Sequence, residues 1–263
     1  MFNYFGYGSN MRRASLASKG VHADSVEPAT LENWRLTFNI GHPFEFEGNV
    51  ANVEPAPGAV VHGALYRFSP ACLDSLDRYE GYGVFYDRHD LEIVTYTGTR
   101  TNALVYVGTP RVVVADGRPS ERYRNILLQG ARELKLADDH LRWLASFPTY
   151  PLADYPPFAP PHNCTLITSG QLARQEEWTA LAGHVFDMSE GRANNRAAML
   201  SFLSARDATA FMLRFMDSSA GDESLHQYAL DHLSNEQRSY LNRYLHEFTR
   251  EYRYVGRLAQ SQA

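Results

Sequence analysis

The chain has 263 residues, of which 44% are hydrophobic and 21% charged, and its formal net charge is -5 at pH 7. This length suits one large or two ordinary domains of a globular protein. The acidic balance argues against a general nucleic-acid-binding protein, whose contact surface would be basic. No apolar run approaches the roughly 20 residues of a membrane helix, so we expect no membrane partner.

The cellular compartment is suggested by the N-terminal residues and the cysteines. No positively charged segment followed by an apolar one opens the chain, which predicts a cytoplasmic protein. Cys72 and Cys164 are too few for a disulfide framework, and free thiols in a reducing compartment fit them better. The histidines of the first half lack the spacing of a metal site such as His-Glu-x-x-His, so we expect no metal.

The chain opens with a strand candidate, Phe2 to Phe5, that runs into Gly6-Tyr-Gly-Ser-Asn10. The glycines allow backbone conformations closed to other residues. A loop of this kind presents successive backbone N–H groups to an anion or a carbonyl oxygen above it. A plain tight turn explains the pattern as well, and Asn10 could equally cap a helix that starts at Met11.

Residues 31–114 then read mostly as strands, because β-branched and aromatic residues alternate in short runs. The clearest strands are predicted over 34–40, 60–68, 91–96 and 101–107. A helix over 71–79 is introduced by Ser69-Pro70, and a longer helix is predicted over Ser120 to Lys135. We therefore expect an α+β fold whose first domain is a small, mixed β-barrel.

A proline-rich segment over 148–163 divides the chain, since proline at this density favours extended backbone. We predict a first domain over 1–147, a linker over 148–163 whose aromatic residues are free to pack on a neighbouring surface, and a second domain over 164–263. The second domain reads as short strands followed by helices. Asp231 to Tyr252 forms an amphipathic helix with a capping box of Ser234 and Gln237, and core packing explains its apolar stripe.

Three segments, in this order and at these separations, resemble the γ-glutamylcyclotransferase family over about residues 1–150. The segments are Tyr7-Gly-Ser-Asn10, Leu76-Asp-Arg-Tyr-Glu-Gly81 and Ser120-Glu-Arg-Tyr-Arg-Asn-Ile-Leu-Leu-Gln-Gly-Ala131. The resemblance implies an enzyme that acts on a small molecule, a γ-glutamyl amine or γ-glutamyl amino acid. The α-amine of that substrate attacks its own γ-carbonyl, and 5-oxoproline and the free amine are released.

The resemblance also implies roles for particular residues. Glu80 is the implied acid/base, and a solvated glutamate at a helix end is the structural alternative. The implied substrate-binding residues are Tyr7, Gly8, Ser9, Asn10, Tyr86 and Tyr123. Tyr86 and Tyr123 could instead be half-buried core tyrosines, and Ser9 has no partner base that would make it a nucleophile. Glu45 and Glu47 could contact the leaving group, but a solvated loop is the expected place for both.

The second domain resembles the cytochrome b5-like domain of the membrane-associated progesterone receptor family over about 165–258. The matching segments include Gly183-His-Val-Phe-Asp-Met-Ser-Glu-Gly-Arg192 and Tyr252-Arg-Tyr-Val-Gly-Arg-Leu258. In that family a tyrosine in an inserted loop ligates haem, whereas here Asn194 or Asn195 takes its place, and neither is a good haem ligand. The resemblance implies a retained fold without haem, so we expect no cofactor.

Two other functions stay open at this point. The second domain could be the functional part, as a haem- or small-ligand-binding protein. It could also be an interaction module that docks another enzyme or a second copy of the chain, which would make a homodimer.

Overall fold

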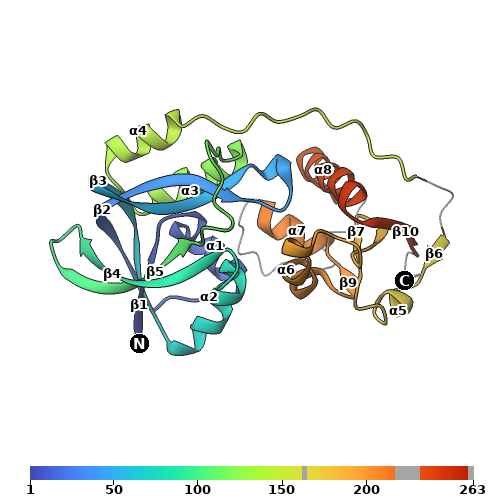
Figure 1. Ribbon diagram of the computed structural model, residues 1–263, viewed down its shortest axis with the longest axis horizontal. Coiled ribbons are helices and arrows are strands. Elements are labelled where there is room, and N and C mark those ends of the chain that lie inside the picture. Colours follow the sequence, from blue (N-terminus) through green and yellow to red (C-terminus); the bar gives the residue numbers. More distant parts are fainter. Residues whose placement is uncertain (162–164, 217–231, 260–263) are drawn as a thin grey trace. The chain divides into compact units, whose positions relative to one another are not determined.

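The computed structural model describes residues 1–161, 165–216 and 232–259 (Figure 1). These residues form two compact units, and the main boundary between them falls between Leu152 and Ala153. The first unit is built on a closed barrel and the second on a five-stranded sheet. Within the described part of the chain, no helix is long and apolar enough to cross a membrane.

Five strands close the barrel in the order β1-β3-β2-β4-β5, which confirms the small β-barrel expected from the sequence. Neighbouring strands are antiparallel, except that β1 and β5 pair in parallel and close the sheet. The strands are β1 Phe2–Gly6, β2 Ser25–Gly41, β3 Asn49–Phe68, β4 Tyr86–Thr95 and β5 Arg100–Gly108. The prediction made β2 and β3 too short, because their long hairpin continues through two register shifts, after Glu32 and after Thr37.

Four α-helices lie in the first unit: α1 Arg13–Ser18, α2 Leu73–Glu80, α3 Glu121–Glu133 and α4 Asp138–Ser146. The two helices predicted from the sequence are α2 and α3. The Ser120 hydroxyl caps α3 by accepting a hydrogen bond from the Tyr123 N–H. The helix α4 was not predicted from the sequence: it is only nine residues long and buries just His140 and Leu144.

The barrel core consists of alternate strand residues that point inward, packed against α3. Phe5, Val53 and Ile93 are fully buried, and Leu127 of α3 joins the same cluster. Full burial of such side chains is worth roughly 1.5–3 kcal/mol each. This packing fixes the position of α3 relative to the C-terminal end of β1, and the candidate site lies between these two elements.

Glu47 is buried, which corrects the expectation of a solvated loop. It lies with Glu45 in the 3-10 turn η2, Glu45–Glu47, but only 2% of its side chain is exposed. Arg122 of α3 donates to its carboxylate from Nε at 3.1 Å and from Nη2 at 2.5 Å. Glu45 is exposed and accepts a hydrogen bond from the Tyr150 hydroxyl. A buried carboxylate is tolerated only with such a partner, and a distant arginine on another element gives no signal in the local sequence.

A histidine pair lies outside the candidate site. His140 is 8% exposed, its ring stacks on Trp143, and its centroid is 4.9 Å from that of His62. Burial lowers the pKa of His140 to about 4, and repulsion from His62 adds to this effect. Burial also lowers the pKa of His62. Both imidazoles are therefore neutral in the folded protein near pH 7.

We expect the folded state to lose stability as the pH falls from about 6.5 towards 4, the window between the unfolded and folded pKa values of His140. Unfolded His140 binds a proton there and the folded one does not, so the free energy of unfolding falls by about 1–2 kcal/mol. Urea unfolding at about pH 7.5 and about pH 5 tests this in the wild type and in His140→Leu. The variant should lose less stability, and an equal loss in both proteins would contradict the prediction.

The second unit is a mixed sheet in the order β6-β10-β8-β7-β9. Its strands are β6 Thr165–Ile167, β7 Trp178–Leu181, β8 His184–Asp187, β9 Arg206–Asp207 and β10 Arg253–Leu258. Its helices are α5 Ser169–Leu172, α6 Ala193–Leu203, α7 Thr209–Met216 and α8 Asn235–Glu251. Phe186 of β8 and Phe248 of α8 are fully buried and meet edge to face.

The predicted helix and its capping box are confirmed in α8, where Ser234 and Gln237 exchange the two hydrogen bonds. Asp231 and Cys164 lie outside the described residues. The side chains of Asn194 and Asn195 are also not described, so the predicted haem-ligand position stays a prediction.

Within the proline-rich segment, residues 155–158 pack on α8. Asn242 accepts a hydrogen bond from the Phe158 N–H at 2.8 Å and donates to the Pro156 carbonyl at 2.9 Å. His246, one turn later on α8, is 2.8 Å from the same carbonyl, and its ring meets Phe158 edge to face. The extended backbone therefore has side-chain partners in place of secondary structure.

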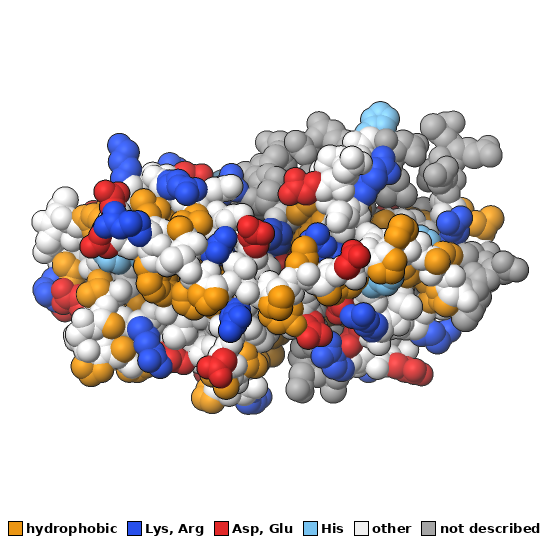
Figure 2. All heavy atoms as spheres, turned by 90° about the horizontal axis from the view of Figure 1, so that it is seen from above, with side chains coloured by type: hydrophobic (Ala, Val, Ile, Leu, Met, Phe, Trp, Pro, Cys, Tyr) orange, Lys and Arg blue, Asp and Glu red, His pale blue; other side chains and the backbone are white. Residues whose placement is uncertain are grey.

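Charged side chains of both signs are interspersed with apolar ones over the face drawn in Figure 2. The described side chains on that face show no large area of one sign. Neither sign of charge therefore dominates the described part of this face.

Candidate active site

The residues singled out in the sequence meet at one small cavity, which has a volume of about 30 Å³. Its walls come from β1 and the turn that follows it, from β3, β4 and β5, and from α2 and α3. The lining residues are Tyr4, Tyr7, Gly8, Ser9, Asn10, Ala51, Glu80, Tyr86, Tyr106 and Tyr123. All seven predicted site residues are in this set, together with Tyr4, Ala51 and Tyr106, which the sequence analysis missed.

The turn after β1 brings backbone N–H groups to the cavity. The 3-10 turn η1 covers Ser9–Met11, and its first hydrogen bond runs from the Met11 N–H to the Gly8 carbonyl. The N–H groups at the start of such a turn have no partner within it and can donate to oxygen atoms outside it. The Ser9 N–H faces the Tyr123 hydroxyl. A Cβ atom on Gly8 would lie 2.9 Å from the Tyr123 hydroxyl, so close approach requires glycine here.

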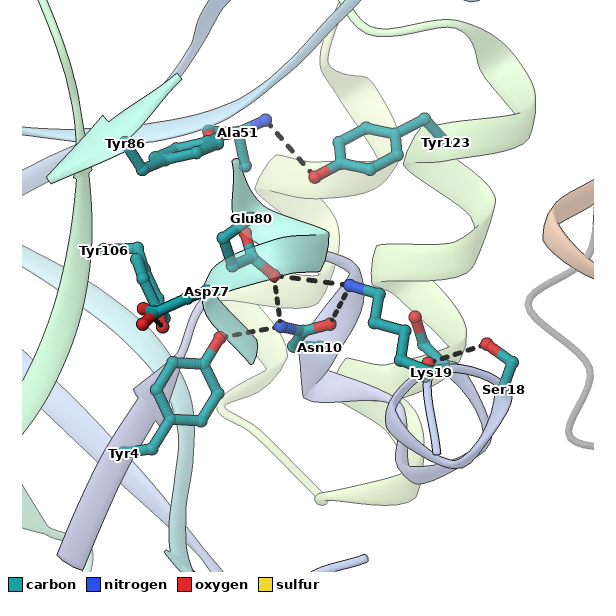
Figure 3. Close-up of polar contacts among 11 residues, drawn as sticks. Tyr4, Asn10, Ser18, Lys19, Ala51, Asp77, Glu80, Tyr86, Tyr106 and Tyr123 are labelled. Carbon is teal, nitrogen blue, oxygen red and sulfur yellow. Dashed lines mark hydrogen bonds and ion pairs between the residues drawn. The ribbon is translucent and has the colours of Figure 1, made fainter. Parts of the chain in front are cut away.

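Asn10 joins the turn to Glu80 and does not cap a helix, which corrects one of the two alternatives. The N-cap of α1 is Arg12, and no side chain caps that helix. Asn10 is 4% exposed, and its Nδ2 donates to the Tyr4 hydroxyl and to Glu80 Oε1, both at 2.8 Å (Figure 3). The short turn ends before α1 begins, which leaves the amide free to point into the site.

Glu80 is the last residue of α2, and the helix stop determines where it lies. Gly81 takes the left-handed conformation at φ 62° and ψ 49°, and its N–H bonds to the Asp77 carbonyl. Glycine adopts this conformation without strain, so the helix ends immediately after Glu80. The Glu80 side chain is 16% exposed and lies 3.3 Å from Lys19 Nζ, so it is not the solvated glutamate of the alternative interpretation.

Three of the tyrosines donate their phenol hydrogens to other groups of the protein. Tyr7 donates to the Tyr106 carbonyl at 2.5 Å, and Tyr86 donates to the Ala51 carbonyl at 2.7 Å. The Tyr106 hydroxyl donates to Asp77 Oδ1 at 2.7 Å. These three rings therefore wall the cavity, with their hydroxyl hydrogens already used.

The remaining two tyrosines accept a hydrogen bond through oxygen. The Tyr123 hydroxyl accepts from the Ala51 N–H at 3.3 Å, and the Tyr4 hydroxyl accepts from Asn10. A phenol that accepts one hydrogen bond still has its own hydrogen to donate. Tyr4 and Tyr123 are thus the phenols best placed to donate to a bound ligand.

Charge in the cavity is concentrated on Glu80. Burial, followed by the nearby Glu80 charge, raises the pKa of Tyr4 and of Tyr7 well above the usual value. Burial raises the pKa of Tyr123 to about 12. The phenols therefore stay neutral near pH 7, and Glu80 is the carboxylate among the described residues that line the cavity.

Two polar groups close to the site were also missed by the sequence analysis. Lys19 directly follows α1 and reaches Asn10 and Glu80, although nothing in its neighbouring residues indicates this. Asp77, one turn before Glu80 on α2, holds Tyr106 and is paired with Arg88. Asp77 could have been found from the sequence, because it lies three residues before Glu80 on the same face of a predicted helix. Within the described residues, no cluster of three or more metal-ligating side chains occurs.

The model of the family described as "Gamma-glutamyl cyclotransferase, AIG2-like" matches residues 4–125. We call this matched N-terminal segment the cyclotransferase region. All the cavity-lining residues lie within the matched range. The cyclotransferase region is 27% identical over 151 residues to a gamma-glutamylcyclotransferase of Bos taurus, in an alignment that covers 55% of this chain and 78% of the bovine protein. A protein of the same name from Homo sapiens is 26% identical over 136 residues, which are 50% of this chain and 71% of the human protein.

The fold of the cyclotransferase region is shared with solved structures. A structure titled "Gamma-glutamyl cyclotransferase" superposes with a TM-score of 0.50 at 23% identity, over 57% of this chain and 89% of that chain. At this identity the likeness establishes the fold of the barrel unit and nothing about its substrate.

Proposed function

We propose that the N-terminal unit is a γ-glutamylcyclotransferase that converts a γ-glutamyl amine or γ-glutamyl amino acid into 5-oxoproline and the free amine. The observation that carries the proposal is the position of Glu80, whose carboxylate lies in a tyrosine-walled cavity beside the Gly8 to Asn10 turn. The family match and the named relatives support the same reaction class.

The chemistry requires no covalent bond to the enzyme. The α-amine of the substrate attacks its own γ-carbonyl carbon, a C–N bond forms in a five-membered ring, and the original C–N amide bond breaks. An α-amine has a pKa of roughly 8, so it must lose a proton before it attacks. Water takes up that proton. As the free amine attacks, Glu80 accepts a second proton from the attacking nitrogen and returns it to the departing nitrogen, so the ring nitrogen keeps one hydrogen and Glu80 ends the turnover as a carboxylate.

The cavity walls would supply the other requirements. Backbone N–H groups of the Gly8 to Asn10 turn stabilise the oxyanion that forms on the γ-carbonyl oxygen. Tyr4 and Tyr123 donate hydrogen bonds to polar groups of the glutamyl moiety, and the rings of Tyr7 and Tyr86 exclude water from it. Holding the glutamyl chain in a curled conformation is the main contribution, because a well-oriented intramolecular reaction has an effective molarity of about 10⁵–10⁸ M.

The direct test is 5-oxoproline release from a panel of substrates by the purified full-length chain. The panel contains γ-glutamyl-alanine, glutathione, γ-glutamyl-ε-lysine and simple γ-glutamyl-alkylamines, which differ only in the leaving amine. Turnover of one class identifies both the reaction and the preferred leaving group. If all of them remain intact with folded protein, the proposed function is wrong.

For the second unit we propose a cytochrome b5-like fold that has lost its haem. A mixed five-stranded sheet with helices and the closing segment that forms β10 support the fold. The loss of haem rests on the sequence at Asn194 and Asn195. We expect that haemin added to the purified protein does not bind, so no Soret band of a one-to-one complex develops. A Soret band that saturates at one equivalent of haemin would contradict the proposal.

A further inference from the structure

Lys19 places a cation against Asn10 and Glu80, two residues that line the cavity. It follows the last residue of α1, yet only 9% of its side chain is exposed. Its Nζ lies 2.6 Å from Asn10 Oδ1 and 3.3 Å from Glu80 Oε1 (Figure 3). Of the 25 lysine and arginine residues in the chain, only two are lysines, Lys19 and Lys135.

A buried ammonium group is unfavourable by several kcal/mol unless it is paired and hydrogen-bonded. Both partners of Lys19 are residues of the cavity, so its burial is linked to the site and not to general packing. Its carboxylate contact is on Oε1, the oxygen that also accepts from Asn10 Nδ2. Among the contacts of the described residues, none engages Oε2, and Figure 3 shows this second oxygen on the side of Ala51.

Lys19 also determines which way the Asn10 amide faces. An ammonium group can only donate hydrogen bonds, so the atom of Asn10 that it contacts must be the carbonyl oxygen. The NH2 group of the same amide is then directed at Glu80 and at the Tyr4 hydroxyl. With the amide reversed, Oδ1 would face the carboxylate, and two acceptors would oppose each other.

We propose that Lys19 is a positioning residue for the cyclisation: it holds Glu80 by Oε1 and Asn10 by Oδ1, so that Glu80 Oε2 faces the reacting amine. The inference rests on the proposed function and adds a residue to its site. Lys19 acts through Glu80 and Asn10 and does not touch the substrate. A compact ammonium suits a position with two acceptors, whereas the planar fork of arginine is built for a single carboxylate.

Steady-state kinetics of Lys19→Met and Lys19→Arg test the proposal, with Lys135→Met as the matched control at the other lysine. We expect Lys19→Met to lower kcat by about 10- to 100-fold with KM within about twofold, because a misplaced acid/base slows chemistry more than binding. Lys19→Arg should restore part of kcat, and Lys135→Met should behave as the wild type. A raised KM with unchanged kcat would mean that Lys19 binds substrate and would overturn the proposal, as would wild-type kinetics in Lys19→Met.

A second readout is independent of turnover and separates this inference from the proposed function. The side-chain amide resonance of Asn10 in the isotope-labelled full chain is assigned by its loss in Asn10→Ala. It should shift in Lys19→Met and stay in place in Lys135→Met, even if no substrate on the panel is turned over. An unchanged Asn10 resonance in a folded Lys19→Met protein would overturn the positioning role.

Discussion

Glu80→Gln should lower kcat/KM for 5-oxoproline release by about 10²–10⁴-fold, the usual contribution of a general acid–base. Glutamine keeps an oxygen that can accept from Asn10 Nδ2 and from Lys19 Nζ, so the hydrogen bonds around position 80 can persist. The amide cannot accept the proton of the α-amine. The loss should therefore be in kcat, with KM changed little.

The matched control is Glu133→Gln, since Glu133 is an exposed carboxylate paired with Arg12 and outside the cavity lining. Its turnover should equal that of the wild type. Glu133→Gln should melt like the wild type, whereas Glu80→Gln should melt several degrees lower because buried Lys19 loses its charged partner. Turnover is therefore compared at a temperature at which all three proteins are folded. Normal turnover by a folded Glu80→Gln protein would refute the assigned mechanism.

The sequence predicted those parts of the fold that depend on local patterns. Alternating strands, the Ser69-Pro70 and Ser120 helix starts and the Ser234 capping box are all encoded within a few residues, and all occur in the structure. The missed features have no such local code. The full length of the β2–β3 hairpin depends on cross-strand pairing, and α4 is only nine residues long and buries just His140 and Leu144.

The candidate site divides in the same way. The residues named from motifs all line the cavity, because each motif includes the backbone feature that positions it, such as Gly81 after Glu80. Lys19 was missed because its importance comes from a contact across the fold, and Tyr4 because nothing in the β1 pattern indicates its hydrogen bond with Asn10. Lys19 meets Glu80 over 61 residues of sequence, a separation that no pattern in a single sequence reports.

Glu47→Gln should lower the free energy of unfolding by about 3 kcal/mol, the lower end for breaking a buried ion pair. The lower end applies because the Arg122 side chain is 27% exposed, so water partly solvates its guanidinium once the Glu47 charge is removed. Urea denaturation followed by tryptophan fluorescence measures the change. Glu45→Gln is the matched control in the same turn, and as an exposed position it should change stability by no more than about 0.5 kcal/mol.

Loss of the Glu47–Arg122 ion pair should also disturb the candidate site. The turn η2, which contains Glu47, leads directly into β3, and β3 carries Ala51. The Ala51 carbonyl accepts from Tyr86 and its N–H donates to Tyr123, so a displaced β3 moves two walls of the cavity. Replacing both partners with apolar residues, Glu47→Leu with Arg122→Met, should recover much of the stability lost in Glu47→Gln, because no buried charge is left unpaired. A double variant as unstable as Glu47→Gln would show that the loss in free energy of unfolding comes from altered side-chain packing and not from the unpaired charge.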